Sequence, residues 1–345
     1  MHGLIDQGAE PALAAKVEFL SRGEAYGLAP GAVVRRETHM SWVFLAGDRA
    51  YKLKKPVRFP YLDFSTRQRR EAACRAELKL NRRLAPDVYL GVIPLTESQG
   101  GLAIGGAGRP VDWLVMMRRL DERFTLERMI EEGRLGIRDV NRLSETLAWF
   151  YRAATPVFLP PAVLLANCWQ NLAFNYRVLA DPRFALPRGL ISRVDRAQRR
   201  FLQRRGQLIA DRLRGRRIVD GHGDLRPEHI WLDDRVRIID CLEFNDRLRV
   251  VDPLDEIAYL SLECERLGAP WVGRCLQGRM KRRLRDGPVD ELFTFYHCQR
   301  ASLRARLAIA HLLEEHPRTP EKWPVLTMTY LRLAEKSARA LDALR

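Results

Sequence analysis

The residues best suited to chemistry lie in one block near the middle of the chain. Asp224 is followed five residues later by the metal-capable side chain of His229, and Asp240 closes a short apolar run after that. Phosphoryl transfer needs such a set, because one carboxylate accepts the proton of the attacking hydroxyl while others hold a divalent ion on nucleotide phosphates. The spacing therefore favours phosphoryl transfer, although either half taken alone is also typical of polar turns that flank a hairpin.

The same block is similar to the catalytic loop and metal-binding motif of the aminoglycoside phosphotransferase and choline kinase-like family, whose fold is protein-kinase-like. That pattern reads His-Gly-Asp-Leu, then Asn five residues after the Asp, then Ile-Asp after a short hairpin. The resemblance implies that Asp224 is the catalytic base, that Arg226 lies near the transferred phosphate and that His222 supports the loop. It also implies that Asp240 binds a metal, with ATP and Mg²⁺, or Mn²⁺, as cofactors.

His229 departs from the family pattern, which has a metal-binding Asn at this position. Imidazole suits zinc, copper or iron better than magnesium, which prefers oxygen ligands. Three alternatives stay open: His229 works in a modified metal site, Glu243 or Asn245 supplies the ligand, or the site has lost activity. Farther along, Asp255 resembles the acid that braces the loop, and the alternative is an ordinary acid at a helix start.

A kinase-like site also requires a strand lysine that grips nucleotide phosphates and a helix glutamate that pairs with it. The resemblance assigns these roles to Lys52, which follows a small residue in the pattern small-x-Lys, and to Glu77 on the following helix. Lys54 is the alternative lysine, because side chains two apart share a strand face. Glu71, earlier on the same helix, is the rival glutamate.

Other nucleotide contacts are expected from the first third of the chain. The run 113–117 resembles the strand that leads to the inter-lobe hinge, so Met116 and Met117 are expected beside adenine, and a plain core strand is compatible with this role. The family's small-molecule kinases use a polar turn for phosphate, and Ser41 is expected to touch phosphate here. The glycine-rich run 100–108 lacks a Lys-Ser/Thr ending and a following helix, so we interpret it as a flexible hairpin loop.

The elements that must position these residues follow from the hydrophobic periodicity. In the first third we predict helices over 11–28 and 66–84 and strands over 36–45, 49–55, 89–94, 101–104 and 113–117. Helices then follow at 126–132, 140–153, 164–180, 190–214 and from 253 onward, around short strands at 218–219, 230–232 and 236–239. The pattern predicts an α+β, bilobal protein-kinase-like fold: an N-terminal helical extension (1–30), a small antiparallel-sheet N-lobe with one helix (31–117) and a mainly helical C-lobe (118–345).

Composition narrows the function classes further. The 345 residues carry a formal net charge of +16, but arginines spread through nearly every helical segment instead of forming one tail, which argues against nucleic acid as a partner. No apolar run approaches the ~20 residues that span a bilayer, and the start lacks a secretory pattern, so we expect a cytoplasmic protein with no membrane partner. The six cysteines show no CxxC spacing, which argues against zinc or disulfides.

The resemblance covers about residues 37 to 263 and points to a largely uncharacterised bacterial branch. Our leading hypothesis is an ATP-dependent phosphotransferase acting on a hydroxyl of a small molecule, and the alternative is a catalytically degenerate nucleotide-binding module with a regulatory or scaffolding role. Acidic residues on the helices could meet a cationic substrate or could be solvated helix faces: Glu127, Glu131, Glu132, Glu256, Glu263 and Glu265. The sequence does not indicate the acceptor or the oligomeric state.

Overall fold

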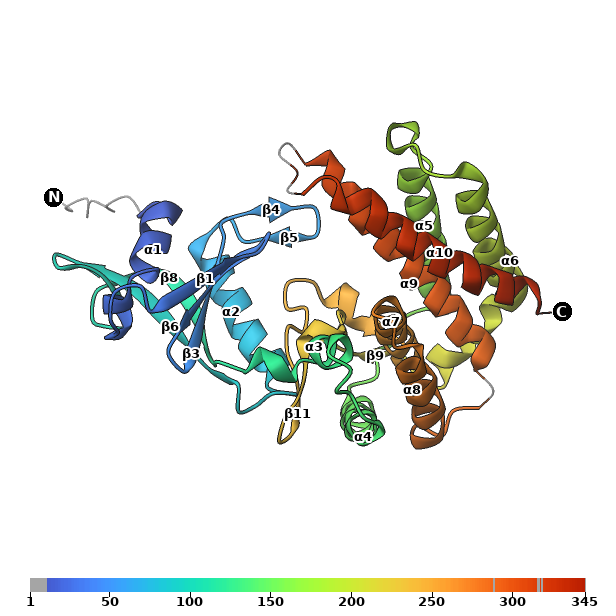
Figure 1. Ribbon diagram of the computed structural model, residues 1–345, viewed down its shortest axis with the longest axis horizontal. Helices are drawn as coiled ribbons and strands as arrows, with labels where there is room; N and C mark the ends of the chain where they lie inside the picture. The colour runs from blue at the N-terminus through green and yellow to red at the C-terminus, as the bar shows by residue number, and fades with distance from the viewer. Residues whose placement is uncertain (1–10, 288, 315–316, 318, 345) are drawn as a thin grey trace. The chain divides into compact units, whose positions relative to one another are not determined.

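The structure, a computed structural model, describes residues 11–287, 289–314, 317 and 319–344. It divides into two compact units (Figure 1). The first runs to Asp121 and also includes the segment Arg237–Asp246, and the second comprises Glu122–Val236 and Arg247–Arg345. The sequence prediction had assigned residues 237–246 to the helical lobe, whereas the structure groups them with the sheet.

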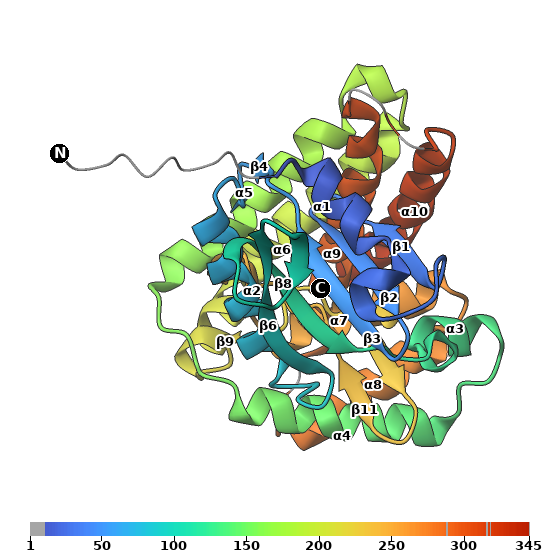
Figure 2. The same cartoon turned by 90° about the vertical axis from the view of Figure 1, so that its left-hand side faces the viewer.

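A six-stranded antiparallel sheet organises the first unit, with the strand order β1-β2-β3-β8-β6-β7. Its strands are β1 (Val33–Glu37), β2 (Ser41–Ala46), β3 (Arg49–Lys54), β6 (Tyr89–Ser98), β7 (Gly101–Ile104) and β8 (Arg109–Arg118). Helix α2 (Arg67–Asn81) packs along β8 and β6, as Figure 2 shows, and a small hairpin consists of β4 (Arg58–Phe59) and β5 (Leu62–Asp63). A short helix, α1 (Leu13–Leu20), precedes the sheet.

The two faces of this sheet have separate cores because side chains alternate along each strand. On the α2 face, Ala50 and Val115 are buried together with Cys74 of the helix. On the opposite face, Leu53 and Leu114 pack with Leu20 of α1 among other apolar side chains. Since Lys52 and Lys54 follow Ala50 at intervals of two, this alternation directs both lysines toward α2.

Two predicted elements of this unit differ from the structure. The strand expected over 36–45 is two strands, because Thr38 Oγ1 accepts hydrogen bonds from the backbone N–H groups of Met40 (3.3 Å) and Ser41 (2.9 Å) and closes a turn between them. Such local side-chain bonds compete with the strand ladder. The helix expected over 11–28 ends at Leu20, and a 3₁₀ turn, Gly23–Tyr26, follows it.

The second unit is mainly helical. Its helices are α3 (Leu126–Glu131), α4 (Ile137–Ala153), α5 (Pro161–Leu179), α6 (Arg188–Arg214), α7 (Pro253–Arg266), α8 (Pro270–Arg283), α9 (Asp290–Ala310) and α10 (Lys322–Asp342). The four helices predicted between residues 126 and 214 are all present, with ends shifted by at most three residues. Aromatic stacking contributes to the core, where the rings of Phe201 (α6) and Phe295 (α9) lie 4.6 Å apart.

Short strands interrupt these helices where the sequence predicted a strand-and-loop insert. They are β9 (Val219–Asp220), β10 (Ile230–Leu232), β11 (Val236–Ile238) and β12 (Val250–Val251), and β12 pairs with β9 in antiparallel register. The pairing of β9 with β12 fixes both ends of the intervening chain, so the loop after β9 starts from a defined position. Among the described residues, no helix combines the length and the apolar character needed to cross a membrane.

Candidate functional site

Four charged side chains of the first unit form a cluster around Glu77. Lys52 Nζ donates to Glu77 Oε1 at 2.9 Å and to Asp240 Oδ1 at 2.8 Å. Lys54 Nζ donates to Glu77 Oε2 at 2.6 Å and also to Glu243. The glutamate in the middle of α2 thus receives both lysines of β3, and each lysine also holds one acid of the segment 237–246.

Burial and charge act in opposite directions on this cluster. Burial alone would lower the pKa of Lys52, but the carboxylates of Asp240 and Glu77 raise that pKa well above its usual value. Burial alone would raise the pKa of Glu77, but the two ammonium groups lower it. For Glu243, burial dominates and raises the pKa. Glu77 is therefore held as a carboxylate between two cations near neutral pH.

The backbone around Asp240 is held in an uncommon conformation. Asp240 has φ +62°, in the left-handed region, where the backbone of a residue with a Cβ is strained. Its N–H donates to the hydroxyl of Tyr89 (3.3 Å), and the N–H of Cys241 donates to Asn81 Oδ1 (2.9 Å). At the start of the segment, buried Arg237 makes an ion pair with Asp87 (2.9 Å). These contacts fix the conformation of the segment. The side chain of Asp240 remains 42% exposed.

The two candidate lysines and the two candidate glutamates have different surroundings in the structure. Both lysines bind Glu77, but the side chain of Lys52 is 15% exposed and contacts Asp240, whereas that of Lys54 is fully buried. Glu71 instead pairs with Arg75 one helical turn away, at 2.8 Å. The geometry thus brings together Lys52, Glu77 and Asp240, and adds Lys54 as a buried second cation.

The residues expected near adenine and phosphate lie on the same sheet. Met117 on β8 is the register partner of Ala50 on β3, and both are buried in the apolar core beside α2. Met116, the neighbouring residue, pairs with Tyr51 and is partly buried. Ser41 is the first residue of β2 and is buried, and its backbone N–H already donates to Thr38 Oγ1 at 2.9 Å, so the predicted phosphate contact of Ser41 stays a prediction.

In the second unit, the carboxylate of Asp224 is held by two side chains. Arg226 Nε donates to Oδ2 at 3.1 Å, and the hydroxyl of Tyr259 on α7 donates to Oδ1 at 3.2 Å. Burial would raise the pKa of Asp224, but Arg226, His229 and His222 lower it. Asp224 is therefore ionised near neutral pH, which is the state that a general base requires.

The backbone of the loop 222–229 rests on Glu256, a residue that sequence reasoning did not assign to this role. Glu256 is fully buried and accepts the N–H groups of His222 (3.0 Å) and Gly223, and Tyr151 donates to its Oε2 (2.9 Å). A Cβ on Gly221 would lie 2.7 Å from Glu256 Oε2, so only glycine allows this close approach. The only sign of this role in the sequence was that Glu256 lies next to Asp255 in the acid-rich start of α7.

Asp255, the acid predicted to brace the loop, has another partner. Arg300 donates to both of its oxygens, at 2.7 and 2.6 Å. The prediction was wrong by one residue because the direction of each side chain depends on how α7 is rotated, and the sequence does not encode that rotation locally. His222, in contrast, lies within the loop, where its Nδ1 accepts the N–H of Asp224 at 3.3 Å.

Both ring nitrogens of His229 are engaged within this loop. Nδ1 lies 2.9 Å from the carbonyl oxygen of Asp224, and Nε2 lies 3.2 Å from Arg226 Nη2. A guanidinium can only donate, so Nε2 accepts and Nδ1 carries the proton. The lone pair that a metal would need is therefore directed at Arg226.

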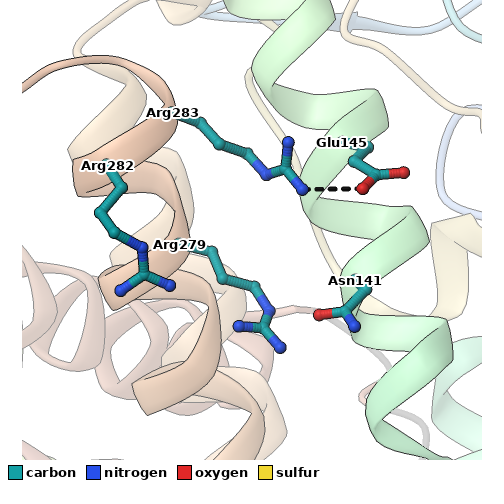
Figure 3. Close-up of a pocket in the computed structure, with 5 residues that line it drawn as sticks. All are labelled: Asn141, Glu145, Arg279, Arg282 and Arg283. Carbon is teal, nitrogen blue, oxygen red and sulfur yellow. Dashed lines mark hydrogen bonds and ion pairs between the residues drawn. The ribbon is translucent and has the colours of Figure 1, made fainter.

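Two pockets of the second unit lie apart from this loop. One of about 330 Å³ lies between α4 and α8 and is lined by Asn141, Glu145, Arg279, Arg282 and Arg283, with Glu145 accepting from Arg283 at 2.7 Å (Figure 3). The other, of about 600 Å³, is bordered by α5, β12 and the start of α7. Neither pocket is lined by a residue predicted to be catalytic, to bind the nucleotide or to bind metal.

Comparisons with known proteins identify relatives of this chain. No family model matches the chain. Uncharacterised proteins from Mycobacterium bovis and Mycobacterium tuberculosis are 34% identical over 287 residues, which is 82% of this chain and 56% of theirs. The chain thus spans about half the length of the curated relatives it matches, and these relatives are consistent with an uncharacterised branch.

Solved structures show the fold. A choline kinase from Cryptosporidium parvum Iowa II superposes with a TM-score of 0.56 at 8% identity, covering 96% of each chain. The GDP complex of aminoglycoside 2'-phosphotransferase-IIIa superposes with a TM-score of 0.51 at 16% identity, covering 94% of this chain and 99% of the other. The chain therefore has the α+β, protein-kinase-like fold of the choline kinases and aminoglycoside phosphotransferases.

Proposed function

We propose that this protein is an ATP-dependent phosphotransferase that moves the γ-phosphate to a hydroxyl group of a small molecule. The observation that carries the proposal is the ammonium of Lys52, which Glu77 and Asp240 share at 2.9 and 2.8 Å. A lysine held by a helix glutamate beside a metal-binding acid is the arrangement that kinases use for nucleotide phosphates. The structural likeness to a choline kinase and to a phosphotransferase in complex with GDP supports the same chemistry.

The first unit would bind the nucleotide. Lys52 is oriented by Glu77 and places its charge where phosphate oxygens can replace Asp240 as its partner. Asp240 offers a partly exposed carboxylate, the ligand type that Mg²⁺ prefers, and one or two carboxylates with substrate phosphates commonly suffice for this ion. Bound Mg²⁺ would neutralise phosphate charge. Because Lys54 already engages Glu243, we assign Glu243 to this ion pair and not to the metal.

The second unit would supply the base. Asp224 is ionised, and Tyr259 and Arg226 fix the direction of its two oxygens. In the transfer step, Asp224 takes the proton of the acceptor hydroxyl while that oxygen forms a bond to the γ-phosphorus. The bond from phosphorus to the β,γ-bridging oxygen breaks, and ADP leaves with the electron pair. Arg226 offsets the charge that develops on the transferred group.

A thermal-shift titration tests the nucleotide site directly. ATP and GTP would each be added with Mg²⁺, Mn²⁺ or no metal to the wild type and to Asp240→Ala. We expect a metal-dependent rise in Tm that the variant loses, with Glu71→Gln as a matched control on the surface of α2. No rise with any nucleotide would refute the proposed nucleotide site.

His229 favours a second candidate, a catalytically degenerate nucleotide-binding module with a regulatory or scaffolding role. Its Nε2 faces Arg226 instead of a metal, so the contribution of the family's Asn is missing from this position. His229→Asn separates the two functions when ADP release is measured with excess ATP. Restored Asn should raise turnover in a degenerate enzyme and lower it in one adapted to histidine.

A further inference from the structure

The acidic residues that could have recognised a cationic acceptor are already engaged inside the second unit. Glu131 pairs with Arg128 (3.1 Å), and Glu132 pairs with Arg134 (2.7 Å). Glu265 is bound by Lys336, and a hydrogen bond with His297 lowers its pKa to about 2. Charges neutralised in this way present little field to an incoming ammonium group.

The two acids on α7 are engaged as well. Glu256 accepts loop N–H groups, as described above. Glu263 is buried and receives Arg266 Nε (2.7 Å), Arg304 Nε (2.8 Å) and the hydroxyl of Tyr330 (2.9 Å). Glu127 has Arg266 at 3.8 Å. Five of the six acids offered by the sequence thus have close partners, whereas Glu127 has only a longer ion pair, and burial together with the neighbouring Glu228 and Glu131 raises its pKa.

Two arginines of α9 bring hydrogen-bond donors to the surroundings of Asp224, in addition to Arg226, which also pairs with Glu228 at 2.6 Å. Arg300 and Arg304 are four residues apart on α9 and therefore share one helix face. Arg300 lies over the ring of Tyr259 at 4.9 Å, and the hydroxyl of Tyr259 donates to Asp224. Arg304 is among the cations that lower the pKa of Asp224. Both arginines therefore belong to the surroundings of the proposed base.

These two guanidinium groups retain unused donors. Arg300 uses Nε and Nη2 on Asp255, and Arg304 uses Nε and Nη2 on Glu263 and Tyr330. In the part of the chain that the structure describes, neither Nη1 forms a hydrogen bond. Guanidinium N–H groups match the oxygens of carboxylates and phosphates. The N–H donors of an ammonium group would instead face the N–H donors of the two arginines.

We infer that the acceptor is a hydroxyl compound that carries an oxyanion, a carboxylate or a phosphate, which Arg304 and Arg300 bind beside Asp224. The inference rests on the proposed function only in naming this ligand the phosphate acceptor. It separates this chain from kinases whose acceptor is an ammonium compound.

Matched ligands test the charge of the site. Glucosamine, glucose, gluconate and glucose 6-phosphate would be titrated by calorimetry up to about 10 mM, a range that detects weak binding, into the full chain with Mg²⁺ and ADP. We expect the anionic members to bind at least about tenfold more tightly than glucose, and glucosamine to bind least. The comparison of gluconate with glucose 6-phosphate identifies which oxyanion is preferred. Strongest binding of glucosamine, equal binding of all four or no binding of either anion would overturn the inference.

Arg304→Gln is the variant of choice, because Glu263 keeps Arg266 and Tyr330 as partners and the buried carboxylate is not abandoned. It should lower the affinity for the anionic compounds about tenfold and leave that for glucose unchanged. Arg304→Lys should recover part of the loss, and Arg339→Gln on the exposed face of α10 is the control. Equal loss for glucose and the anions would show a structural effect and contradict the inference.

The nucleotide titration keeps the two proposals apart. Anion binding without any nucleotide-dependent shift would leave the charge inference standing and remove the phosphotransferase function. A metal-dependent nucleotide shift together with preferred binding of glucosamine would do the reverse.

Discussion

The two charged sites of this protein are stabilised in different ways. In the first unit, charged side chains hold one another: Lys52 and Lys54 share Glu77, and each lysine also binds a second carboxylate. In the second unit, one buried acid, Glu256, holds backbone N–H groups, and Asp224 is oriented by a phenol and a guanidinium. The first site therefore depends on the balance of buried charges, whereas the second depends on loop geometry. Substitutions should affect stability most in the first and turnover most in the second.

The largest effect on turnover should come from the second site. Asp224→Ala should lower the rate by roughly 10²- to 10⁴-fold, because general bases contribute about that much, while ATP binding is spared. The measurement is ADP release alongside a nucleotide thermal shift. Retained turnover would refute the assignment of Asp224 as the base.

The largest effect on stability should come from the first site. Glu77→Gln leaves two buried ammonium groups without their shared carboxylate. It should lower the free energy of unfolding by about 3–5 kcal/mol, as removal of one partner of a buried ion pair does. Chemical denaturation measures this loss. Glu71→Gln, on the exposed side of the same helix, should change the free energy of unfolding by less than about 0.5 kcal/mol. Similar losses in the two variants would contradict the difference drawn between these glutamates.

The two lysines provide the next contrast. Lys52→Ala should chiefly weaken productive ATP binding, since this lysine is the one that reaches Asp240. Lys54→Ala should chiefly lower stability, because Lys54 is fully buried between Glu77 and Glu243. Nucleotide titration and denaturation of both variants give the comparison. If Lys54→Ala has the larger effect on ATP affinity, the phosphate-binding role belongs to Lys54.

The pH dependence of stability should reveal the same ion pairs. The pKa of Glu77 is lowered in the folded state, so its contribution is present above the ordinary glutamate pKa and is lost as pH falls through the folded-state value. The pKa of Lys52 is raised, so its contribution is present below the ordinary lysine pKa and is lost as pH rises through the higher folded-state value. Denaturation between acid and neutral pH should show a weaker acid dependence in Glu77→Gln than in the wild type. An identical slope would mean that Glu77 is not held ionised.

The smallest effect concerns the support of the loop. Tyr259→Phe removes one hydrogen bond to Asp224. It should lower the free energy of unfolding by about 0.5–1.5 kcal/mol, a typical net contribution of one hydrogen bond. Tyr259 donates to the ionised form of Asp224, so its loss should move the acid limb of the rate profile to higher pH. An unchanged limb would show that the neighbouring cations, and not Tyr259, set the pKa of Asp224.

The sequence predicted much of the fold because its signals are local. Alternation in β3 placed Lys52 and Lys54 on one face, helical periodicity located α2 and its Glu77, and the turn residues between β9 and β11 marked the loop. The structure departs where a local competitor acts, as at Thr38, whose hydroxyl closes a turn inside the strand expected over 36–45. Such a hydroxyl is visible in the sequence, but its choice of partner depends on the neighbouring chain.

The sequence by itself determined which residues are chemically competent and the order in which they occur, since motif spacing and periodicity are properties of neighbouring residues. Only the tertiary structure decided which acids are committed to other partners. In the structure Glu256, and not Asp255, binds the backbone of the loop. Glu243 pairs with Lys54, and Glu263 accepts from two arginines. In the cluster around Glu77, ion pairs join residues 23 to 189 positions apart. They form where helices and strands bring charges together, and burial stabilises them because an unpaired buried charge is too costly.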